Sequence, residues 1–155
     1  MTGPRIHALS VSASKGTPKT NVSAVELVAG HGIAGDAHAG DWHRQVSLLA
    51  LESIAKMQAR GAEVGPGAFA ENVTTEFLDV AHLQVGDRLA LGEAELEVTQ
   101  IGKECHDRCE IYRQVGDCVM PREGAFARVV KGGRVQVGDP ISLLPGAAPP
   151  APASP

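Results

Sequence analysis

Aromatic side chains are scarce in this chain, and long apolar runs are missing. One Trp, one Tyr and three Phe make up 3% of its 155 residues. Proteins that bind single-stranded nucleic acids stack the bases on aromatic rings, so this composition argues against that class. No apolar run approaches the roughly 20 residues that a membrane-spanning helix needs, and the first residues lack the apolar core of a signal peptide. We therefore expect no nucleic-acid partner and no membrane partner.

The charge balance and the cysteine count exclude further classes. The formal net charge is -4 and the isoelectric point is about 5.8, which gives no general attraction to nucleic acid or anionic lipid. The three cysteines are an odd number and lie beside charged residues, which is not typical of a disulfide framework. We therefore expect a cytoplasmic protein in a reducing compartment.

The composition predicts a mainly β fold. The core must come from Val, Leu, Ile and Ala, and the 18 Gly and 10 Pro predict many turns between short strands. The length suits one domain, which we place at residues 1–145. Residues 146–155 are rich in Pro and Ala and are expected to form a disordered tail.

Alternating apolar residues predict the strands, and one amphipathic stretch predicts a helix over 52–60 that ends before Gly61. Val-Gly-Asp occurs at 85–87, 115–117 and 137–139 and is expected to form the same turn each time. Gly-Glu at 92–93 and Gly-Gly at 132–133 predict two hairpins. The expected strands are 5–14, 22–28, 46–50, 71–75, 88–91, 94–101, 126–130, 134–137 and 140–143.

All three cysteines lie in the stretch 102–124, which we call the cysteine stretch. Cys105 stands among Lys103, His106 and Arg108, and cationic neighbours favour the thiolate, which is both the nucleophile and the metal ligand. The alternative is a buried, inert cysteine. Because a buried cysteine is usually surrounded by apolar residues, we predict a functional role for Cys105.

The other two cysteines have different surroundings. Cys109 follows Cys105 by four residues, so on a helical turn the two would share a face. Cys109 is then either a second ligand for a soft metal or a thiol that resolves an oxidised or persulfidated Cys105. Cys118 lies in an apolar context and is expected to pack in the core. The spacing of the three matches no standard zinc or iron–sulfur motif.

A loop at 30–44 is rich in glycine and histidine, which lets its backbone approach a ligand closely. Asp36, His38 and His43 are candidate metal ligands, or the histidines hold hydrogen bonds or anions instead. Together with Arg44, the backbone of the loop is a candidate phosphate cradle. The sequence has no P-loop and no dinucleotide-binding fingerprint.

Two further residues complete the candidate site. Asn72 stands at the entry of a predicted strand, where it either faces a ligand or caps local backbone. Arg122 is suited to bidentate capture of an anion, or it forms an exposed ion pair with Glu123.

An ordered set of motifs resembles the MOSC domain, which is found at the C-terminus of molybdenum cofactor sulfurases. The resemblance covers roughly residues 22–143, and the cysteine stretch is similar to that of small stand-alone bacterial members. The motifs are Gly-Asp-Ala-His-Ala-Gly at 35–40, Gln-Val-Ser-Leu-Leu at 45–49, Glu-Asn-Val-Thr-Thr at 71–75, Gly-Asp at 86–87, Gly-Lys-Glu-Cys-His at 102–106 and Gly-Asp at 138–139.

The resemblance implies a closed, bent β-barrel of the pyruvate-kinase-insert type with a few short helices. It implies that Cys105 carries persulfide sulfur or binds molybdenum of the molybdenum cofactor. Basic residues around it would hold the pterin phosphate, with Asp36, His38 and Asn72 on the opposite wall. The implied partners are molybdenum-cofactor biosynthesis proteins or a sulfur-donating desulfurase.

Three interpretations of function follow. The favoured one is a persulfide carrier or sulfurtransferase that acts in maturation of molybdenum cofactor. The second is a non-enzymatic carrier of metal or cofactor. The third is a molybdenum-dependent reductase of N-hydroxylated compounds. The chain shows no pyridoxal phosphate domain of the large sulfurases and no extra N-terminal barrel of the amidoxime reductases.

Overall fold

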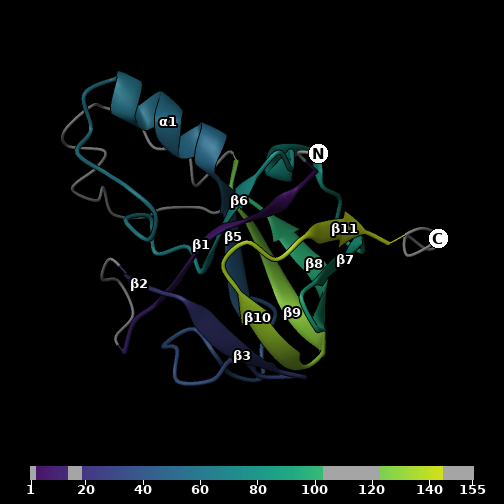
Figure 1. Ribbon diagram of the computed structural model, residues 1–155. Coiled ribbons are helices and arrows are strands. Elements are labelled where there is room, and N and C mark those ends of the chain that lie inside the picture. The colour runs from purple at the N-terminus through teal and green to yellow at the C-terminus, as the bar shows by residue number, and fades with distance from the viewer. Residues whose placement is uncertain (1–2, 14–18, 103–122, 145–155) are drawn as a thin grey trace.

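The computed structural model describes residues 3–13, 19–102 and 123–144 and shows a mainly β protein (Figure 1). The large sheet has eight strands in the order β11-β7-β8-β9-β5-β6-β1-β2, and a smaller sheet has the order β10-β3-β4. The strands are β1 Arg5–Val11, β2 Thr20–Val22, β3 Ala24–Val28, β4 Gly32–Ile33, β5 Val46–Ala50, β6 Val73–Glu76, β7 Arg88–Leu91, β8 Ala94–Ile101, β9 Ala125–Lys131, β10 Gly133–Gln136 and β11 Ile141–Leu143.

The main core lies between the two sheets. Every residue of β5 is buried, because both faces of this central strand are covered. Val46 and Leu48 belong to the main core, whereas Leu49 on the opposite face belongs to a second cluster with Ile54 and Phe126. The second cluster is covered by α1, Leu51–Ala59, so the helix packs on the outer face of the large sheet (Figure 1).

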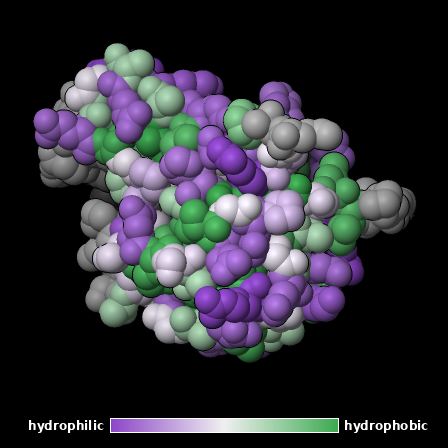
Figure 2. Space-filling view, in the orientation of Figure 1, coloured by the Kyte–Doolittle hydropathy of each residue, from purple (hydrophilic) through white to green (hydrophobic). Residues whose placement is uncertain are grey.

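The helix matches its prediction within a residue at each end. Gly61 has φ 98°, the left-handed conformation expected after a helix C-terminus. A short 3-10 helix, η1 Val80–His82, lies between β6 and β7. In those residues no helix is long and apolar enough to cross a membrane. The face in Figure 2 shows hydrophilic and apolar residues interspersed rather than one broad apolar area.

The closed barrel is not confirmed. The end strands β11 and β2 of the large sheet are not paired with each other, and no sheet of the described residues closes. β1 does contact the residues just before β11. Arg5 forms an isolated bridge with Pro140, and the Ile6 amide donates a hydrogen bond to the Asp139 carbonyl at 2.9 Å. These contacts bring β1 beside the start of β11 without a continuous ladder.

Two of the three Val-Gly-Asp turns are described, and they are built alike. Asp87 accepts a hydrogen bond from the Gln84 amide at 2.8 Å, and Asp139 accepts one from the Gln136 amide at 2.9 Å. The glycine between them has φ 99° in the first turn and 94° in the second, which favours glycine. The repeated sequence therefore produces the same turn twice. The first turn comes directly before β7, and the second comes shortly before β11. The copy at 115–117 lies outside the described residues.

The second predicted hairpin is wrong. The first one is confirmed, since β7 and β8 pair directly across Gly92-Glu93, but β10 pairs with β3 rather than with β9. The Gly-Gly pair is needed for close packing: a Cβ on Gly132 would stand 2.7 Å from the Leu27 carbonyl oxygen. The chain here passes from the large sheet to the small one.

The predicted strand 22–28 is likewise divided between the sheets. β2 pairs with β1 in the large sheet, whereas β3 pairs with β10 and β4 in the small one. Ser23 lies between them, and its carbonyl accepts a hydrogen bond from Val137 at 3.0 Å. The first strand ends at Val11, three residues before its predicted end.

Candidate functional site

A buried ion pair fixes the middle of the glycine–histidine loop. The ammonium of Lys19 lies 2.8 Å from Oδ1 of Asp36, and both side chains are fully buried. Asp36 also accepts hydrogen bonds from the backbone amides of Ser12 at 3.0 Å and His38 at 3.1 Å. Lys19 donates a further hydrogen bond to the Ser12 hydroxyl at 3.1 Å. The carboxylate thus ties the loop to the end of β1.

The protonation of Asp36 follows from these contacts. Burial by itself would raise the pKa of Asp36, but the hydrogen bond from Lys19 and the two backbone amides outweigh it and hold the pKa below its ordinary value. Asp36 is therefore ionised at neutral pH and serves as the structural anchor of the loop.

His38 lies half-buried next to this anchor. Its Nδ1 atom is 3.9 Å from Oδ2 of Asp36, and its carbonyl accepts a hydrogen bond from the indole of Trp42 at 2.7 Å. No group of three His, Cys, Asp or Glu side chains in the described residues is arranged to hold a metal ion. The structure therefore gives the loop an organised hydrogen-bond network but no metal centre of its own.

The far end of the loop meets the base of the cysteine stretch. The Gly102 amide donates to the Gly124 carbonyl at 2.7 Å, so the two described ends of the stretch lie together. Gln100 connects them to the loop: its Oε1 atom bonds His43 at 2.9 Å and Arg44 at 3.2 Å, and its amide donates to the Gly102 carbonyl at 2.8 Å. The loop and the base of the stretch therefore form one junction.

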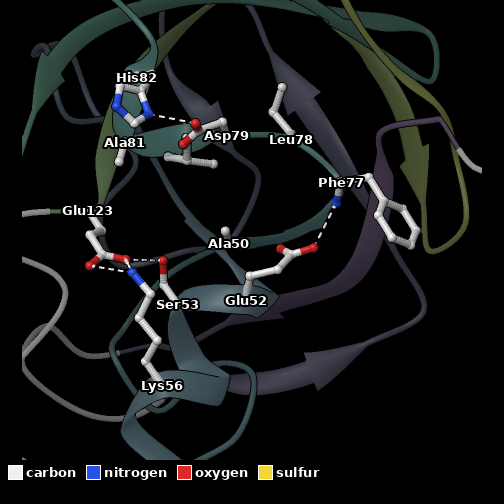
Figure 3. A pocket seen from close by; sticks show the side chains of 11 residues that line it. Ala50, Glu52, Ser53, Lys56, Phe77, Leu78, Asp79, Ala81, His82 and Glu123 are labelled. Carbon is white, nitrogen blue, oxygen red and sulfur yellow. Dashed lines mark hydrogen bonds and ion pairs between the residues drawn. The ribbon is translucent and has the colours of Figure 1, made fainter.

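The C-terminal end of the stretch is also held by α1. The carboxylate of Glu123 accepts a hydrogen bond from Ser53 and forms an ion pair with Lys56, whose ammonium is 3.0 Å away (Figure 3). These side chains line a hollow of about 570 Å³ that also contains Glu52 and Phe77. Phe77 has φ 62°, an uncommon conformation for a bulky residue, and its amide donates to Glu52 at 3.1 Å.

Asn72 holds three strands together. Its Oδ1 atom accepts a hydrogen bond from the Ser47 amide at 2.9 Å, and its Nδ2 atom donates to the Ser10 carbonyl at 3.1 Å. Since Asn72 is fully buried, the capping alternative describes its contacts better than a ligand-facing one. Its role in cofactor binding stays a prediction.

Glu71 beside it is a buried carboxyl that the sequence did not single out. It accepts hydrogen bonds from the Gly67 amide at 2.7 Å, the Phe69 amide at 3.1 Å and the Thr74 hydroxyl at 2.9 Å. Burial raises the pKa of Glu71 in spite of these donors. The residue organises the turn that precedes β6.

The structure thus brings some predicted residues together and leaves others untested. Asp36 and His38 are adjacent, and Asn72 is linked to them through β1. Arg44 and Gln100 connect the loop to the base of the cysteine stretch. The sequence analysis had named Arg44 as part of the loop, but no local sequence pattern indicated Gln100. The predicted site residues outside the described part of the chain are Lys103, Cys105, His106, Arg108, Cys109 and Arg122, together with Cys118.

Several solved structures have the same fold as this chain. Among solved structures, the YuaD protein from Bacillus subtilis superposes with a TM-score of 0.75 at 19% identity, covering 89% of this chain and 93% of that one. YiiM from Geobacillus stearothermophilus superposes with a TM-score of 0.68 at 20% identity, covering 92% of this chain and 76% of that one. For YiiM from Escherichia coli the TM-score is 0.64 at 22% identity, and the match covers 90% of this chain and 69% of that one. At these identities the likeness shows the fold.

No curated protein sequence matches the chain. The family model of the MOSC domain matches residues 35–142, which include residues 35–44 of the glycine–histidine loop, Asn72 and the whole cysteine stretch. This match extends over more than half of the sequence and agrees with the resemblance seen in the motifs. The chain therefore belongs to the MOSC domain family.

Proposed function

We propose that this protein binds molybdenum cofactor, or a precursor of it, and handles its sulfur or metal through Cys105. Membership of the MOSC family supports a connection with molybdenum cofactor in general. The observation that carries the proposal is the Gln100 junction, which joins the glycine–histidine loop to the base of the stretch that contains Cys105. A loop that ends in Arg44, next to the base of a thiol-containing stretch, suits a ligand with an anionic end and a sulfur-bound metal.

The residues present fit the cofactor by their donor chemistry. The pterin phosphate would be held by basic side chains, and the described candidates are Arg44 and His43, with Lys103, His106, Arg108 and Arg122 proposed from the sequence. When bound, the cofactor supplies a soft, redox-active metal with sulfur ligands, for which a cysteine thiolate is a matching ligand. Asp36 would act indirectly, by holding the loop through Lys19.

Sulfur handling would use thiol chemistry of the chain itself. A Cys105 persulfide would give up its outer sulfur to an attacking nucleophile, so that the sulfur–sulfur bond breaks and the electron pair stays on the Cys105 thiolate. If Cys109 attacks the inner sulfur of the persulfide instead, a Cys105–Cys109 disulfide forms and hydrosulfide leaves. A molybdenum-cofactor biosynthesis protein or a desulfurase would supply the sulfur.

The test is to purify the full chain anaerobically and measure molybdenum, tungsten, zinc and iron together with pterin fluorescence. We expect pterin and molybdenum in the wild-type protein and their loss in Cys105→Ala. Cys118→Ala is the matched control, because Cys118 has an apolar sequence context and should leave both signals unchanged. Zinc without pterin would refute the proposal.

A second measurement separates a sulfur carrier from a passive cofactor carrier. After incubation with a cysteine desulfurase and cysteine, alkylation and mass spectrometry should detect one additional sulfur on Cys105. If the cofactor binds but no persulfide is ever trapped on Cys105, the protein is a carrier without sulfur chemistry.

A further inference from the structure

Lys19 bridges two segments that are far apart in the sequence. Its backbone amide donates to the Gly67 carbonyl at 2.9 Å, and its own carbonyl oxygen would lie 2.5 Å from a Cβ added to Gly67, so the two backbones are in close contact. The ammonium at the other end of the residue forms the buried ion pair with Asp36. Lys19 therefore connects the turn 65–70 to the glycine–histidine loop.

The carboxyl group of Glu71 holds the turn 65–70 from inside. One of its oxygens accepts a hydrogen bond from the Gly67 amide at 2.7 Å, and the other accepts one from the Phe69 amide at 3.1 Å. Within the turn Ala70 has φ 63°, a left-handed conformation that is unfavourable for a residue with a Cβ. The closed shape of the turn therefore depends on Glu71, and so does the contact between Gly67 and Lys19.

No cation lies in contact with this carboxyl group among the described residues. Glu71 is fully buried, and its partners are two amides and the Thr74 hydroxyl, which are all neutral. The turn 65–70, β2 and β5 contain no ionisable side chain, and the exposed Arg60 and Glu63 precede the turn. The charged residues of the other neighbouring elements have partners elsewhere: Arg5 and His7 of β1 with Glu76 of β6, Lys19 with Asp36, and Glu52 and Lys56 of α1 with the Phe77 amide and Glu123.

These surroundings determine which form of Glu71 the closed turn prefers. A buried carboxyl group without a countercharge is favoured in its neutral form, whereas a carboxylate is favoured by contact with water. Burial accordingly raises the pKa of Glu71 in the closed turn. Proton binding and closure of the turn therefore favour each other, and ionisation favours an open turn. The Thr74 hydroxyl serves either form, because it can donate or accept a hydrogen bond.

We propose that Glu71 is a proton-controlled latch that positions the glycine–histidine loop through Lys19. With its proton bound, Glu71 keeps the turn 65–70 closed on Lys19, and the ammonium of Lys19 holds Asp36 and the loop. As the pH rises and Glu71 ionises, the turn opens more often, Lys19 loses its backbone contact with Gly67, and the loop becomes less ordered. This inference concerns the order of the loop and does not depend on which ligand the loop binds.

Amide hydrogen exchange of the full chain, followed by NMR, tests the latch. The reporters are the amides of Gly67 and Phe69 in the turn, of Lys19, and of His38, which donates to Asp36 in the loop. With the intrinsic pH dependence of exchange divided out, we expect the protection of all four to fall several-fold as the pH rises from about 5 to 7. The buried Val98 amide, bonded to the Asp87 carbonyl at 2.8 Å, reports global opening and should fall less.

Variants assign the response to Glu71. Glu71→Gln cannot ionise, so it should abolish the pH dependence of the four amides, although the loss of one acceptor oxygen lowers their protection at every pH. Glu26→Gln is the matched control: Glu26 is exposed on β3, and the wild-type response should remain. Thr74→Val removes a donor to the carboxylate, so protection should begin to fall at a higher pH. Urea unfolding of each variant shows that the fold is retained.

Lys19→Met tests the connection to the loop. In this variant the Gly67 and Phe69 amides should keep their pH dependence, while the His38 amide should lose it. The inference is overturned if protection in the wild type does not change with pH, or if the change persists in Glu71→Gln, since the histidines of the loop would then be responsible. A wild-type response confined to the turn, with constant protection of His38, would overturn the connection between the latch and the loop.

Discussion

Replacing Lys19 with Met should be among the most damaging single changes away from the hydrophobic core. The substitution keeps an unbranched side chain of similar length but removes the ammonium that lies 2.8 Å from Asp36. Because both side chains are fully buried, the remaining carboxylate would have no countercharge and no access to water. Removing one partner of a buried pair costs about 3–5 kcal/mol, a large part of the total of about 5–15 kcal/mol typical of a domain.

The matched control is Lys56→Met. Lys56 also pairs with a carboxylate, that of Glu123 at 3.0 Å, but its side chain is 63% exposed. An exposed pair contributes at most about 1 kcal/mol. We would measure both free energies of unfolding in urea by far-ultraviolet circular dichroism and by the emission of Trp42, which lies in the loop that Asp36 anchors.

The pH dependence provides a second check on the Lys19 variant. The pKa of Asp36 in the folded protein is lowered from its ordinary value of 3.8, so the stability that the pair contributes is present above that value and is lost as the pH falls through the folded pKa. The difference between wild type and Lys19→Met should therefore be full at pH 7 and shrink on acidification, since protonation also discharges the isolated carboxyl of the variant.

A double-mutant cycle decides whether the two side chains act as a pair. The double variant Lys19→Met with Asp36→Asn removes both charges and leaves no buried ion. Its loss of unfolding free energy should therefore be smaller than the sum of the two single losses by about 1 kcal/mol or more. Additive losses within about 0.5 kcal/mol, or a Lys19→Met loss no larger than that of Lys56→Met, would refute the reasoning.

Two further predictions concern the turn before β6. Gly67→Ala should unfold at a clearly lower urea concentration, because Gly67 has φ 94° and an added Cβ would stand 2.5 Å from the Lys19 carbonyl oxygen; Gly65→Ala, with nothing within 4 Å, is its control. Burial raises the pKa of Glu71 from 4.5, so the wild type should lose stability relative to Glu71→Gln as the pH rises from about 4.5 toward 7. An unchanged difference between these pH values would contradict the second prediction.

The sequence by itself determined the local structure of this protein. The two described Val-Gly-Asp turns form as predicted because an aspartate side chain bonds an amide three residues earlier and the glycine adopts positive φ. The strands 46–50, 88–91 and 94–101 have their predicted ends, because each combines apolar residues with flanking turn signals. These features depend on neighbours in the chain, which a sequence displays directly.

The sheet partners could not be predicted in the same way. The Gly-Gly at 132–133 is typical of a hairpin turn, yet β10 crosses to the small sheet and pairs with β3, more than 100 residues earlier. The glycines are required there by the nearby Leu27 carbonyl and Glu93 rather than by a turn. The requirement arises from the approach of two distant segments, for which the local pattern carries no signal.

The candidate site shows the same division. The sequence identified the glycine–histidine loop and the cysteine stretch by their composition, and predicted that they face each other. Only the tertiary structure decided that Lys19 neutralises Asp36, that Gln100 joins the loop to the base of the stretch, and that Arg44 lies near the rings of both Trp42 and Phe126. Burial, countercharge and ring contacts depend on side chains brought together from separate strands and loops, and so they exist only once the chain has folded.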